Sequence, residues 1–559
     1  MTRPSPSPYH RDVQPIILSA QMREIDRTTI ERCGTPSLDL MESAARATAE
    51  AVMERALVAN SSVLILCGPG NNGGDGAATA RLLAQAGARV DVVLFGKVEN
   101  TKGDAQANFT RLQEPDGDAS IRFFECESSE HWSRLEENEL SKPYEILVDA
   151  LFGTGLTRPL EGVFSEVVGY FSRAREKEDP PAIVSIDIPS GLNADSAQLI
   201  GPAVQADITI TFTALKPANV LPPAASYNGE LIVADIGSPD ELVQEAGTQL
   251  FMSEEGDARR WLIQTRYVPD SYKNTHGHVL VIAGSRGFTG AAALCANAAM
   301  RSGAGLVTLG TPVSAVALMA AQTMPEVMTA ALAETDRGAV SEEAVGHVLA
   351  LAERAHVTAI GPGLSSGDER TRAFVRAMVE KRSTPVVVDA DGLNCLAPWP
   401  ADLRGSADLP VVLTPHQGEM LRLIGTDDKA VLNDRVTAAR EFAAAHEVIL
   451  VLKGTRPIIA GPDGRVFVNS TGNAGLGTAG AGDTLTGVIA GFLAQAYGTL
   501  KHDANAFEAV VAALYISGLA GDLAAEEIGM RAMVASDIRE HLSAAICLLD
   551  PEGELPLTT

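Results

Sequence analysis

The sequence predicts an α/β protein built from two successive domains, each with a parallel β-sheet. Three observations carry this prediction: short apolar runs alternate with helical patterns, the alternation begins again near residue 275, and Gly-rich turns follow several of the apolar runs. Strands that are apolar on both faces are typical of a parallel sheet covered by helices on each side. A chain of 559 residues is long enough for two large α/β domains.

Composition excludes several classes of protein. The 44 Lys and Arg against 71 Asp and Glu give a net charge of −27, which argues against nucleic acid or an anionic membrane as a general partner. With 46% hydrophobic and 21% charged residues, wholesale disorder is excluded. Six cysteines without a CxxC pair argue against a disulfide scaffold or a zinc ribbon. We expect a cytoplasmic protein with no signal peptide, because the first 20 residues lack an apolar region of secretory type.

The expected first domain covers residues 15–250. Residues 1–14 are polar and Pro-rich, and we expect a disordered tail there. Residues 18–58 have a helical pattern, with Ser37 as a candidate N-cap. The expected strands cover residues 63–66, 90–95, 145–148, 183–188 and 208–212, and a helix over 77–86 follows the first of them.

The expected second domain covers residues 265–555. An acidic, helix-like stretch over 237–261 precedes it, and we place the boundary near 255–270. The expected strands cover residues 279–283, 306–310, 357–360, 385–389, 411–414 and 448–452, and helices are expected over 291–301 and 484–494.

The first Gly-rich turn carries more polar residues than a simple turn needs. Residues 68–73 match GxGxxG, which lets a phosphate approach the backbone at a helix N-terminus. The match alone is weak, because residues 475–480 have the same spacing, and a tight turn without a ligand remains an alternative. Asn71, Asn72 and Asp75 are costly in a buried turn unless they bind something.

Two further strand ends in the first domain carry oxygen-bearing side chains. Asp149 ends one strand before a Gly-rich loop at 153–155, and Asp187 and Ser190 follow the next. Ligands bind at the carboxyl ends of strands in doubly wound sheets, so these turns could together hold a hard cation and a polar substrate. Taken singly, each aspartate could instead be an N-cap or turn residue.

With these motifs, residues 15–240 resemble the N-terminal epimerase domain of the NAD(P)H-hydrate repair enzymes. The resemblance implies a Rossmann-like domain that interconverts the R and S epimers at C6 of hydrated NADH and NADPH (NADHX and NADPHX). It implies potassium ligands at Asn72, Asp149 and Ser190. It implies substrate contacts at Asn71, Asn72, Gly73, Gly74 and Asp75, at Gly153, Thr154, Gly155, Leu156, Thr157, Arg158 and Pro159, and at Asp187.

We expect Asp187 to be the general acid–base group of this domain. C6 carries a hydroxyl next to the ring nitrogen, so water can leave and return through an iminium-like state. This removes the configuration at C6, and a positioned carboxyl can donate and accept the proton that the exchange requires. The alternative is a nicotinamide-dependent dehydrogenase, in which Asp91 would bind a ribose. Asp75 argues against it, because its carboxylate would crowd a pyrophosphate.

The strongest motif of the chain lies at 473–487 in the second domain. Small residues crowd 477–482, Asp483 follows them, and an apolar helix begins at once. The N-terminus of such a helix can stabilise a phosphoryl group during its transfer, and Asp483 can accept the proton of an attacking hydroxyl. The alternative is a buried turn with Asp483 as an N-cap.

This motif is similar to the G-A-G-D signature of ribokinase-type kinases. With further motifs at 288–292, 361–364, 414–419 and 453–457, residues 265–555 resemble the dehydratase domain of the same repair enzymes. Two loop positions depart from the pattern: Ser365 stands where Gly is expected, and Gln417 where Pro is common.

The resemblance implies a ribokinase-like domain that dehydrates the S epimer with ADP and Mg²⁺, giving NADH or NADPH, AMP and phosphate. Asp483 would be the base on the C6 hydroxyl. The hydrated nicotinamide would contact Ala292, Gly363, His416 and Asp483. The nucleotide would contact Lys453, Gly454, Thr455, Arg456 and Pro457, and Gly480, Ala481 and Gly482 would complete the anion hole.

Two other functions stay open at this point. An ATP-dependent kinase of a small molecule would share the anion hole, and a catalytically dead regulator would share the fold. The fused first half favours repair, and intact Asp187 and Asp483 argue against a dead protein. The preference for ADP is a family inference, and the residues do not separate NADHX from NADPHX. We expect a homo-oligomer whose partners are small molecules, with neither nucleic acid nor membrane.

Overall fold

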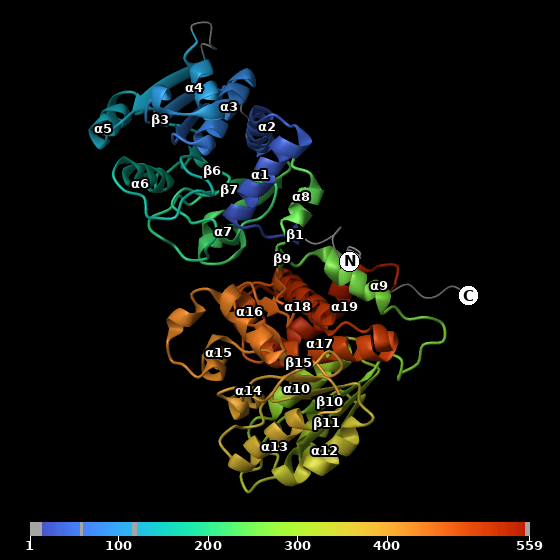
Figure 1. Ribbon diagram of the computed structural model, residues 1–559. Helices are drawn as coiled ribbons and strands as arrows, with labels where there is room; N and C mark the ends of the chain where they lie inside the picture. Colours follow the sequence, from blue (N-terminus) through green and yellow to red (C-terminus); the bar gives the residue numbers. More distant parts are fainter. Residues whose placement is uncertain (1–13, 56–59, 115–119, 554–559) are drawn as a thin grey trace. The chain divides into compact units, whose positions relative to one another are not determined.

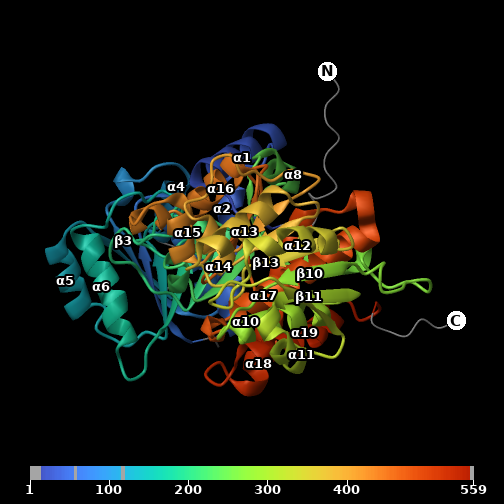
Figure 2. The ribbon, with the colours of Figure 1, turned by 90° about the horizontal axis from the view of Figure 1, so that it is seen from below.

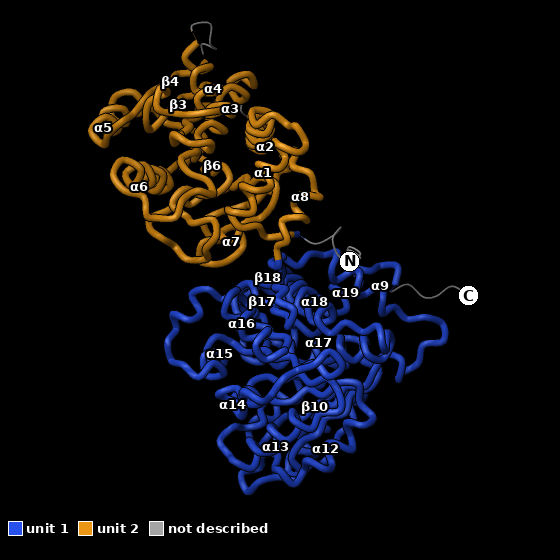
Figure 3. The backbone as a smooth tube through the Cα atoms, in the orientation of Figure 1, with its two compact units in different colours: residues 1–14, 249–559 blue, residues 15–248 orange. Residues whose placement is uncertain are grey.

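The computed structural model describes residues 14–55, 60–114 and 120–553. The chain forms two compact units, one over Pro15–Thr248 and the other from Gln249 onwards together with Gln14 (Figure 3). The tail expected over residues 1–14 lies outside the described residues except for Gln14, which belongs to the short strand β1 (Gln14–Pro15).

The N-terminal unit contains a seven-stranded, wholly parallel sheet. Its strand order is β4-β3-β2-β5-β6-β7-β8. The chain runs outwards from β2 to β4 and then returns to place β5 on the other side of β2, which is the doubly wound order of a Rossmann-like domain. The strands are β2 (Ser62–Cys67), β3 (Arg89–Phe95), β4 (Ile121–Cys126), β5 (Ile146–Ala150), β6 (Ala182–Ile186), β7 (Ile208–Phe212) and β8 (Glu230–Ala234).

Helices cover both faces of this sheet (Figure 1). One apolar cluster joins the sheet to α2, α3 and α4, and another joins its opposite face to α5 and α6. The helices are α1 (Ser19–Cys33), α2 (Ser37–Arg55), α3 (Asn71–Gln85), α4 (Gly103–Leu112), α5 (Ser129–Asn138), α6 (Val163–Arg175), α7 (Pro217–Val220) and α8 (Asp240–Glu245).

Helix α3 begins six residues earlier than the sequence indicated. Residues 71–76, expected in a turn, form its first turns because their glycines let the helix lie directly against the strand ends. A Cβ on Gly73 would lie 1.8 Å from the carbonyl oxygen of Gly68, and one on Gly76 would lie 2.6 Å from the Cβ of Ala150. The turn itself is confined to residues 68–70.

Strands β4 and β8 were missing from the sequence prediction. Both lie at the edges of the sheet, where most of their residues are only partly buried. Edge strands do not need to be apolar on both faces, so their mixed composition hid them.

The C-terminal unit contains an 11-stranded sheet with the order β1-β9-β18-β17-β16-β15-β14-β13-β10-β11-β12. From β16 to β12 the neighbouring strands are parallel, and β17 is antiparallel to both of its neighbours. The strands after β1 are β9 (Leu250–Met252), β10 (His278–Ile282), β11 (Leu306–Pro312), β12 (Val327–Leu332), β13 (Val357–Ile360), β14 (Val386–Val388), β15 (Val411–Leu413), β16 (Ile449–Leu452), β17 (Ile458–Ala460) and β18 (Val466–Val468).

Helices lie on both sides of this sheet as well. In Figure 2, α12 and α13 lie on one side of β10 and β11, and α18 and α19 lie on the other. The longer helices are α9 (Glu255–Gln264), α10 (Thr289–Arg301), α11 (Val316–Gln322), α12 (Val345–Ala352), α13 (Glu369–Glu380), α14 (Asp391–Leu396), α15 (Gln417–Ile424), α16 (Arg435–His446), α17 (Ala481–Gln495), α18 (Ala506–Ile528) and α19 (Ala535–Leu549). Within the described residues, α18 alone is long and apolar enough to cross a membrane, and 72% of its most apolar window is buried in the structure.

The boundary between the units lies earlier than 255–270. It falls between Thr248 and Gln249, because β9 pairs in parallel with β18 and α9 packs on the C-terminal core. The indole of Trp261 on α9 stacks on Phe492 of α17, with ring centroids 4.1 Å apart. The stretch over 237–261 therefore contains a strand of the second sheet as well as helices.

Helix α17 packs against α10 through glycines. A Cβ on Gly487 would lie 2.1 Å from the carbonyl oxygen of Cys295, and one on Gly491 would lie 1.9 Å from Ser302 Oγ. This close approach fixes the position of the α17 N-terminus, which carries the Gly-rich motif.

We predict that Gly487→Ala lowers the free energy of unfolding of the C-terminal unit by about 1–3 kcal/mol, because α17 and α10 must move apart. Gly346→Ala is the matched control, since Gly346 lies on α12 with nothing within 4 Å of an added Cβ. Urea unfolding of the full chain measures both variants. Equal midpoints for the two would contradict the packing argument.

Candidate active sites

A cavity of about 430 Å³ lies at the carboxyl ends of the strands of the N-terminal unit. The sequence-predicted residues that line it are Asn71, Asn72, Asp75, Gly153, Thr154, Gly155 and Asp187. They come from three segments far apart in the chain, which meet because parallel strands end at the same edge of the sheet.

The other predicted contacts lie outside the lining of this cavity. Gly73 and Gly74 are buried in the first turn of α3 and serve its close packing. Leu156 is buried in the cluster with α5 and α6. Thr157, Arg158 and Pro159 continue the loop away from the lining residues.

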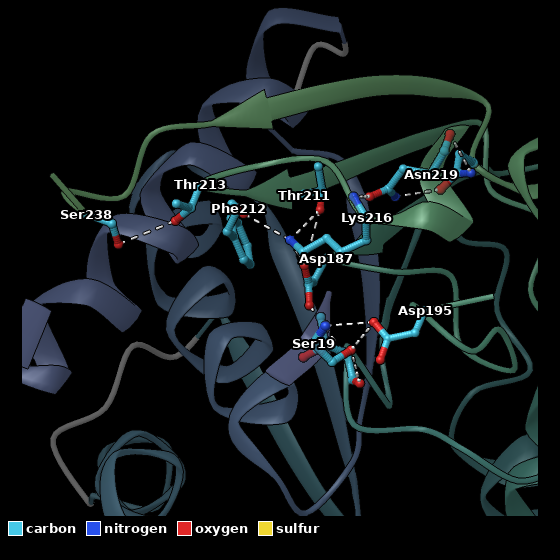
Figure 4. Close-up of polar contacts among 11 residues, drawn as sticks. Ser19, Asp187, Asp195, Thr211, Phe212, Thr213, Lys216, Asn219 and Ser238 are labelled. Atoms are coloured by element: carbon cyan, nitrogen blue, oxygen red, sulfur yellow. Dashed lines mark hydrogen bonds and ion pairs between the residues drawn. The ribbon is translucent and has the colours of Figure 1, made fainter. Parts of the chain in front are cut away.

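Asp187 follows β6 in a left-handed backbone conformation, with φ of 65°. Its Oδ1 lies 2.9 Å from Lys216 Nζ and accepts a hydrogen bond from Thr211 Oγ1 at 3.3 Å. Its Oδ2 accepts one from the Thr154 amide at 3.3 Å. These contacts hold the carboxylate at the cavity wall (Figure 4).

Lys216 was missed by the sequence analysis, although its side chain also lines the cavity. The side chain is only 1% exposed, and Nζ donates to Asp187 Oδ1, to Thr211 Oγ1 at 2.8 Å and to the Phe212 carbonyl at 2.9 Å (Figure 4). A buried ammonium needs such partners. The available signal was that Lys216 is the sole charged residue between Asp207 and Glu230.

Three more carboxyl groups line the same cavity, those of Asp26, Asp75 and Asp104. Burial raises the pKa of Asp75 well above its ordinary value, and the carboxylates of Asp187 and Asp26 add to the effect. Burial likewise raises the pKa of Asp26 to about 6, although Lys216 opposes this shift. The site therefore combines an ion-paired carboxylate with carboxyls that hold a proton more readily.

The predicted potassium ligands are only partly brought together. The Asp149 carboxylate is fully buried and accepts hydrogen bonds from Ser185 Oγ at 2.9 Å and from the Ser190 amide and Oγ at 2.8 and 2.6 Å. Burial raises its pKa, while these hydrogen bonds lower it. Asn72 lies beside Gly153, and its buried Nδ2 has no hydrogen-bond partner.

Asp91 is not a ribose ligand. It lies in the first half of β3, away from the Gly-rich turn, with its side chain 2% exposed. Its carboxylate pairs with Arg122 at 2.7 Å and with Lys142 at 2.8 Å, and it accepts a hydrogen bond from the Tyr144 hydroxyl. Asp91 thus has a structural role, which removes the observation that favoured a dehydrogenase.

The second site lies where α17 begins. Gly480 adopts φ of 85° before the helix, and Asp483 lies in its first turn. A Cβ on Gly482 would lie 3.3 Å from Lys453 Nζ, so the lysine that follows β16 reaches the helix N-terminus. The helix amides and this ammonium together form a site for an anion.

Asp389 organises this site and was not singled out from the sequence. It follows β14, is 1% exposed, and accepts contacts from Lys453 Nζ and Thr486 Oγ1, both at 2.6 Å. Burial lowers the pKa of Lys453, but the carboxylates of Asp389 and Glu419 outweigh this and raise it, so Lys453 stays charged. Asp389 could have been found in the sequence because it follows an apolar strand, as Asp149 and Asp187 do.

Burial raises the pKa of Asp483 to about 6, and the Asp389 carboxylate adds to this while Lys453 opposes it. A carboxyl with such a pKa is ionised at neutral pH yet is a better proton acceptor than an exposed aspartate. Asp483 therefore has both the position and the basicity that a general base needs at this helix N-terminus.

His416 caps helix α15. Its Nδ1 accepts hydrogen bonds from the amides of Gly418 and Glu419 at 3.0 and 3.4 Å, and Glu419 Oε2 accepts one from the His416 amide at 2.8 Å. The ring is 55% exposed, and this bonding pattern assigns the ring proton to Nε2. Gln417, where Pro is common, occupies the first position of the helix.

The remaining predicted positions shape loops around this site. Gly363 has φ of 63°, and a Cβ there would lie 2.6 Å from the Phe288 carbonyl oxygen; Ala292 is fully buried nearby on α10. Ser365 has φ of 68°, which explains why Gly is expected there. In the segment Lys453, Gly454, Thr455, Arg456 and Pro457, the guanidinium of Arg435 holds the carbonyls of Thr455 and Arg456 at 2.9 and 3.4 Å.

The second GxGxxG match has a structural explanation. Its start lies in the short helix Ala474–Gly477, which Asn473 caps through Oδ1 to the Gly475 amide at 2.9 Å. A Cβ on Gly475 would lie 2.7 Å from Met533 Cε, so this glycine serves close packing at the approach to α17.

Comparison with known proteins identifies a family for each half of the chain. A family model described as NAD(P)H-hydrate dehydratase matches residues 279–544, and one described as YjeF-related protein N-terminus matches residues 37–218. A solved structure titled as an ADP/ATP-dependent NAD(P)H-hydrate dehydratase from Bacillus subtilis, co-crystallised with ATP and Mg²⁺, is 30% identical. It covers 53% of this chain and 98% of its own, with a TM-score of 0.46.

Relatives also match over nearly the whole chain. The bifunctional NAD(P)H-hydrate repair enzyme of Moorella thermoacetica is 39% identical, over 96% of this chain and 98% of its own length. The enzyme of that name from Escherichia coli is 33% identical, over 86% of this chain and 84% of its own length. The resemblance of each half is thereby confirmed, and the chain belongs to the family of bifunctional NAD(P)H-hydrate repair enzymes.

Proposed function

We propose that this protein repairs hydrated NADH and NADPH, with the N-terminal unit interconverting the R and S epimers and the C-terminal unit dehydrating the S epimer. The observation that carries the proposal is the occurrence, in one chain of this family, of two aspartates that each lie near a lysine at a strand-end site. Asp187 contacts Lys216 in the first unit, and Asp483 lies near Lys453 in the second.

In the epimerase step, Asp187 serves as an acid–base group on the C6 hydroxyl. When the hydroxyl takes a proton, the C6–O bond breaks, water leaves, and the ring nitrogen supplies the electrons for an iminium-like state. Water then adds to the other face of C6 and gives up a proton. The buried ammonium of Lys216 lies 2.9 Å from the Asp187 carboxylate and holds it in place at the cavity wall.

In the dehydratase step, Asp483 takes the proton of the C6 hydroxyl, whose oxygen attacks the terminal phosphoryl group of ADP. The bond to the leaving AMP breaks, and the amides at the α17 N-terminus with Lys453 stabilise the charge on the transferring group. Phosphate then leaves C6 and a proton leaves C5, which restores the reduced nicotinamide. The nucleotide lies along Lys453–Pro457 and Gly480–Gly482, and the hydrated ring lies against Ala292, Gly363 and His416.

Potassium fits the site at Asp149. The carboxylate is fully buried and accepts a hydrogen bond from the Ser190 hydroxyl, which lies 3.2 Å from the Phe152 carbonyl oxygen. Among the described residues, no cationic side chain pairs with this carboxylate. A bound K⁺ would supply the missing positive charge and fix the loops that follow β5 and β6. Asp149 and Ser190 would hold it, and Asn72 would complete the set through its amide oxygen.

Magnesium is expected to enter with the nucleotide, where it neutralises phosphate charge. In the described part of the chain, no group of three or more His, Cys, Asp or Glu side chains is arranged to hold a metal ion. Phosphate oxygens and water would therefore supply most of its ligands, which is the usual mode for this ion.

The direct test follows the absorbance of reduced nicotinamide after purified protein is mixed with both epimers of hydrated NADH and with ADP or ATP in separate reactions. Complete recovery of both epimers with a nucleotide is the expected result. Recovery limited to the spontaneous epimerisation rate would contradict the epimerase assignment. No recovery with either nucleotide would favour the ribokinase-type kinase, to be tested on vitamin precursors and sugars.

Single substitutions should separate the two activities. We expect Asp187→Asn to lower epimerisation by at least about 100-fold, because it removes an acid–base group, while nucleotide-dependent dehydration of the S epimer continues. Asp483→Asn should do the reverse. Chromatography of the epimers measures the first activity, and absorbance measures the second. Loss of both activities in either variant would contradict independent sites.

The dehydratase should also lose activity in acid. A general base works when ionised, and burial raises the pKa of Asp483 to about 6. We therefore expect kcat/KM for the S epimer to fall as the pH drops through about 6 and to be level just above it. Thermal unfolding over the same pH range controls for denaturation. A rate that rises on acidification would instead assign Asp483 as an acid.

A further inference from the structure

Helix α1 contributes a carboxyl group to the cavity that holds Asp187. Asp26 lines the cavity, and its Oδ1 is buried without a hydrogen-bond partner. Buried polar atoms in native proteins are nearly always paired, so an unpaired one inside a cavity indicates a contact with a ligand. Neither the motifs nor the mechanism above uses this residue.

The position of Asp26 is fixed by the way α1 is anchored. At the first residue of the helix, the Ser19 amide and hydroxyl donate to Asp195 Oδ1 at 2.6 and 2.9 Å, and the hydroxyl also donates to the Thr154 carbonyl at 3.0 Å (Figure 4). Thr154 in turn contacts Asp187 through its amide. Asp26 lies seven residues after Ser19, which is two turns further along the same helix face.

The charges around Asp26 suit a group that exchanges a proton. Burial raises its pKa to about 6, and Lys216 opposes the shift while Asp187 adds to it. Burial also raises the pKa of Asp75 well above the ordinary range, and the carboxylates of Asp187 and Asp26 add to this effect. The charged and titratable groups that line the cavity with Asp26 are Arg23, Asp75, Asp104, Asp187 and Lys216.

We propose that Asp26 is the second acid–base group of the epimerase site and works opposite Asp187. This inference rests on the proposed function of the N-terminal unit. Moving a hydroxyl from one face of C6 to the other requires a proton donor for the departing oxygen and a proton acceptor for the arriving water. Two carboxyl groups from different elements can supply the donor and the acceptor at the same time. A single carboxyl group would have to act on both faces of C6 in turn.

The proton balance of the step closes without a co-reactant. Protonated Asp26 gives its proton to the C6 hydroxyl, the C6–O bond breaks, and water leaves. Water then adds to the opposite face of C6 and passes a proton to the Asp187 carboxylate, which is paired with Lys216. The pair retains one proton throughout, and the reverse reaction returns the proton to Asp26.

The test follows conversion of pure S-NADHX into the R epimer by chromatography, in the full chain and without nucleotide. Asp26→Asn should lower kcat by at least about 100-fold, while equilibrium dialysis shows NADHX binding within about threefold of the original protein. Glu24→Gln is the matched control on the same helix, because Glu24 pairs with Arg27 at the surface. The control should leave kcat unchanged.

A pH profile distinguishes catalysis from a structural role. The rate of the original protein should decline as the pH rises through about 6, where Asp26 loses the proton that it donates. Asp26→Asn should lack this limb, and Asp26→Glu, which keeps a carboxyl, should retain it. Thermal unfolding shows whether Asp26→Asn folds. If it does not, the pH profile of Asp26→Glu is used to test whether a carboxyl at this position gives the high-pH limb.

The outcomes separate this inference from the proposed function. If the original protein does not epimerise NADHX, the proposed function of the N-terminal unit fails. If it does, and Asp26→Asn keeps kcat within twofold or keeps the high-pH limb, the inference about Asp26 alone is overturned.

Discussion

Both sites depend on one geometric constraint, which is close packing of the helix that begins at the site. In the N-terminal unit this helix packs against strand ends, and in the C-terminal unit it packs against another helix. In the N-terminal unit, Gly73 and Gly76 let α3 start against the turn after β2 and the end of β5. In the C-terminal unit, Gly487 and Gly491 let α17 lie directly on α10. A side chain at any of these positions would displace a helix N-terminus, and with it the amides that face the substrate.

The second common element is the use of lysine beside buried carboxylates. Lys216 is held by one carboxylate, one hydroxyl and one carbonyl, and Lys453 is held by Asp389. Such pairs add little net stability, because removing both charges from water is costly. Their value lies in function: each pair holds the lysine nitrogen at a fixed point near carboxyl groups whose pKa values burial raises.

The two units differ in what this charge acts on. In the N-terminal unit, Lys216 contacts Asp187, the proposed acid–base group, and this suits proton transfer to and from a neutral hydroxyl. In the C-terminal unit, the lysine contacts Asp389 and faces Gly482, while Asp483 remains separate. That arrangement suits transfer of a phosphoryl group from a nucleotide to a hydroxyl: a cationic, amide-lined pocket stabilises the phosphoryl charge, and a separate carboxylate accepts the hydroxyl proton. The fusion of the two chemistries in one chain fits a substrate that exists as two epimers.

Sequence alone determined the α/β class, the order of the two domains, and most of the strands that are buried on both faces, because those strands are continuous apolar runs. The three-residue strands β17 and β18 are also buried but were not predicted. It also determined three candidate site aspartates from local features: Asp149 and Asp187 follow apolar runs, and Asp483 follows the Gly-rich motif that precedes an apolar helix. Edge strands such as β4 and β8 were not predicted, because their half-exposed residues do not form a continuous apolar run. The first residues of α3 were assigned to a turn, because their glycines are also typical of turns. Only the tertiary structure showed that Lys216, Asp26 and Asp389 belong to the sites and that Asp91 does not, because burial and pairing arise between segments distant in the chain.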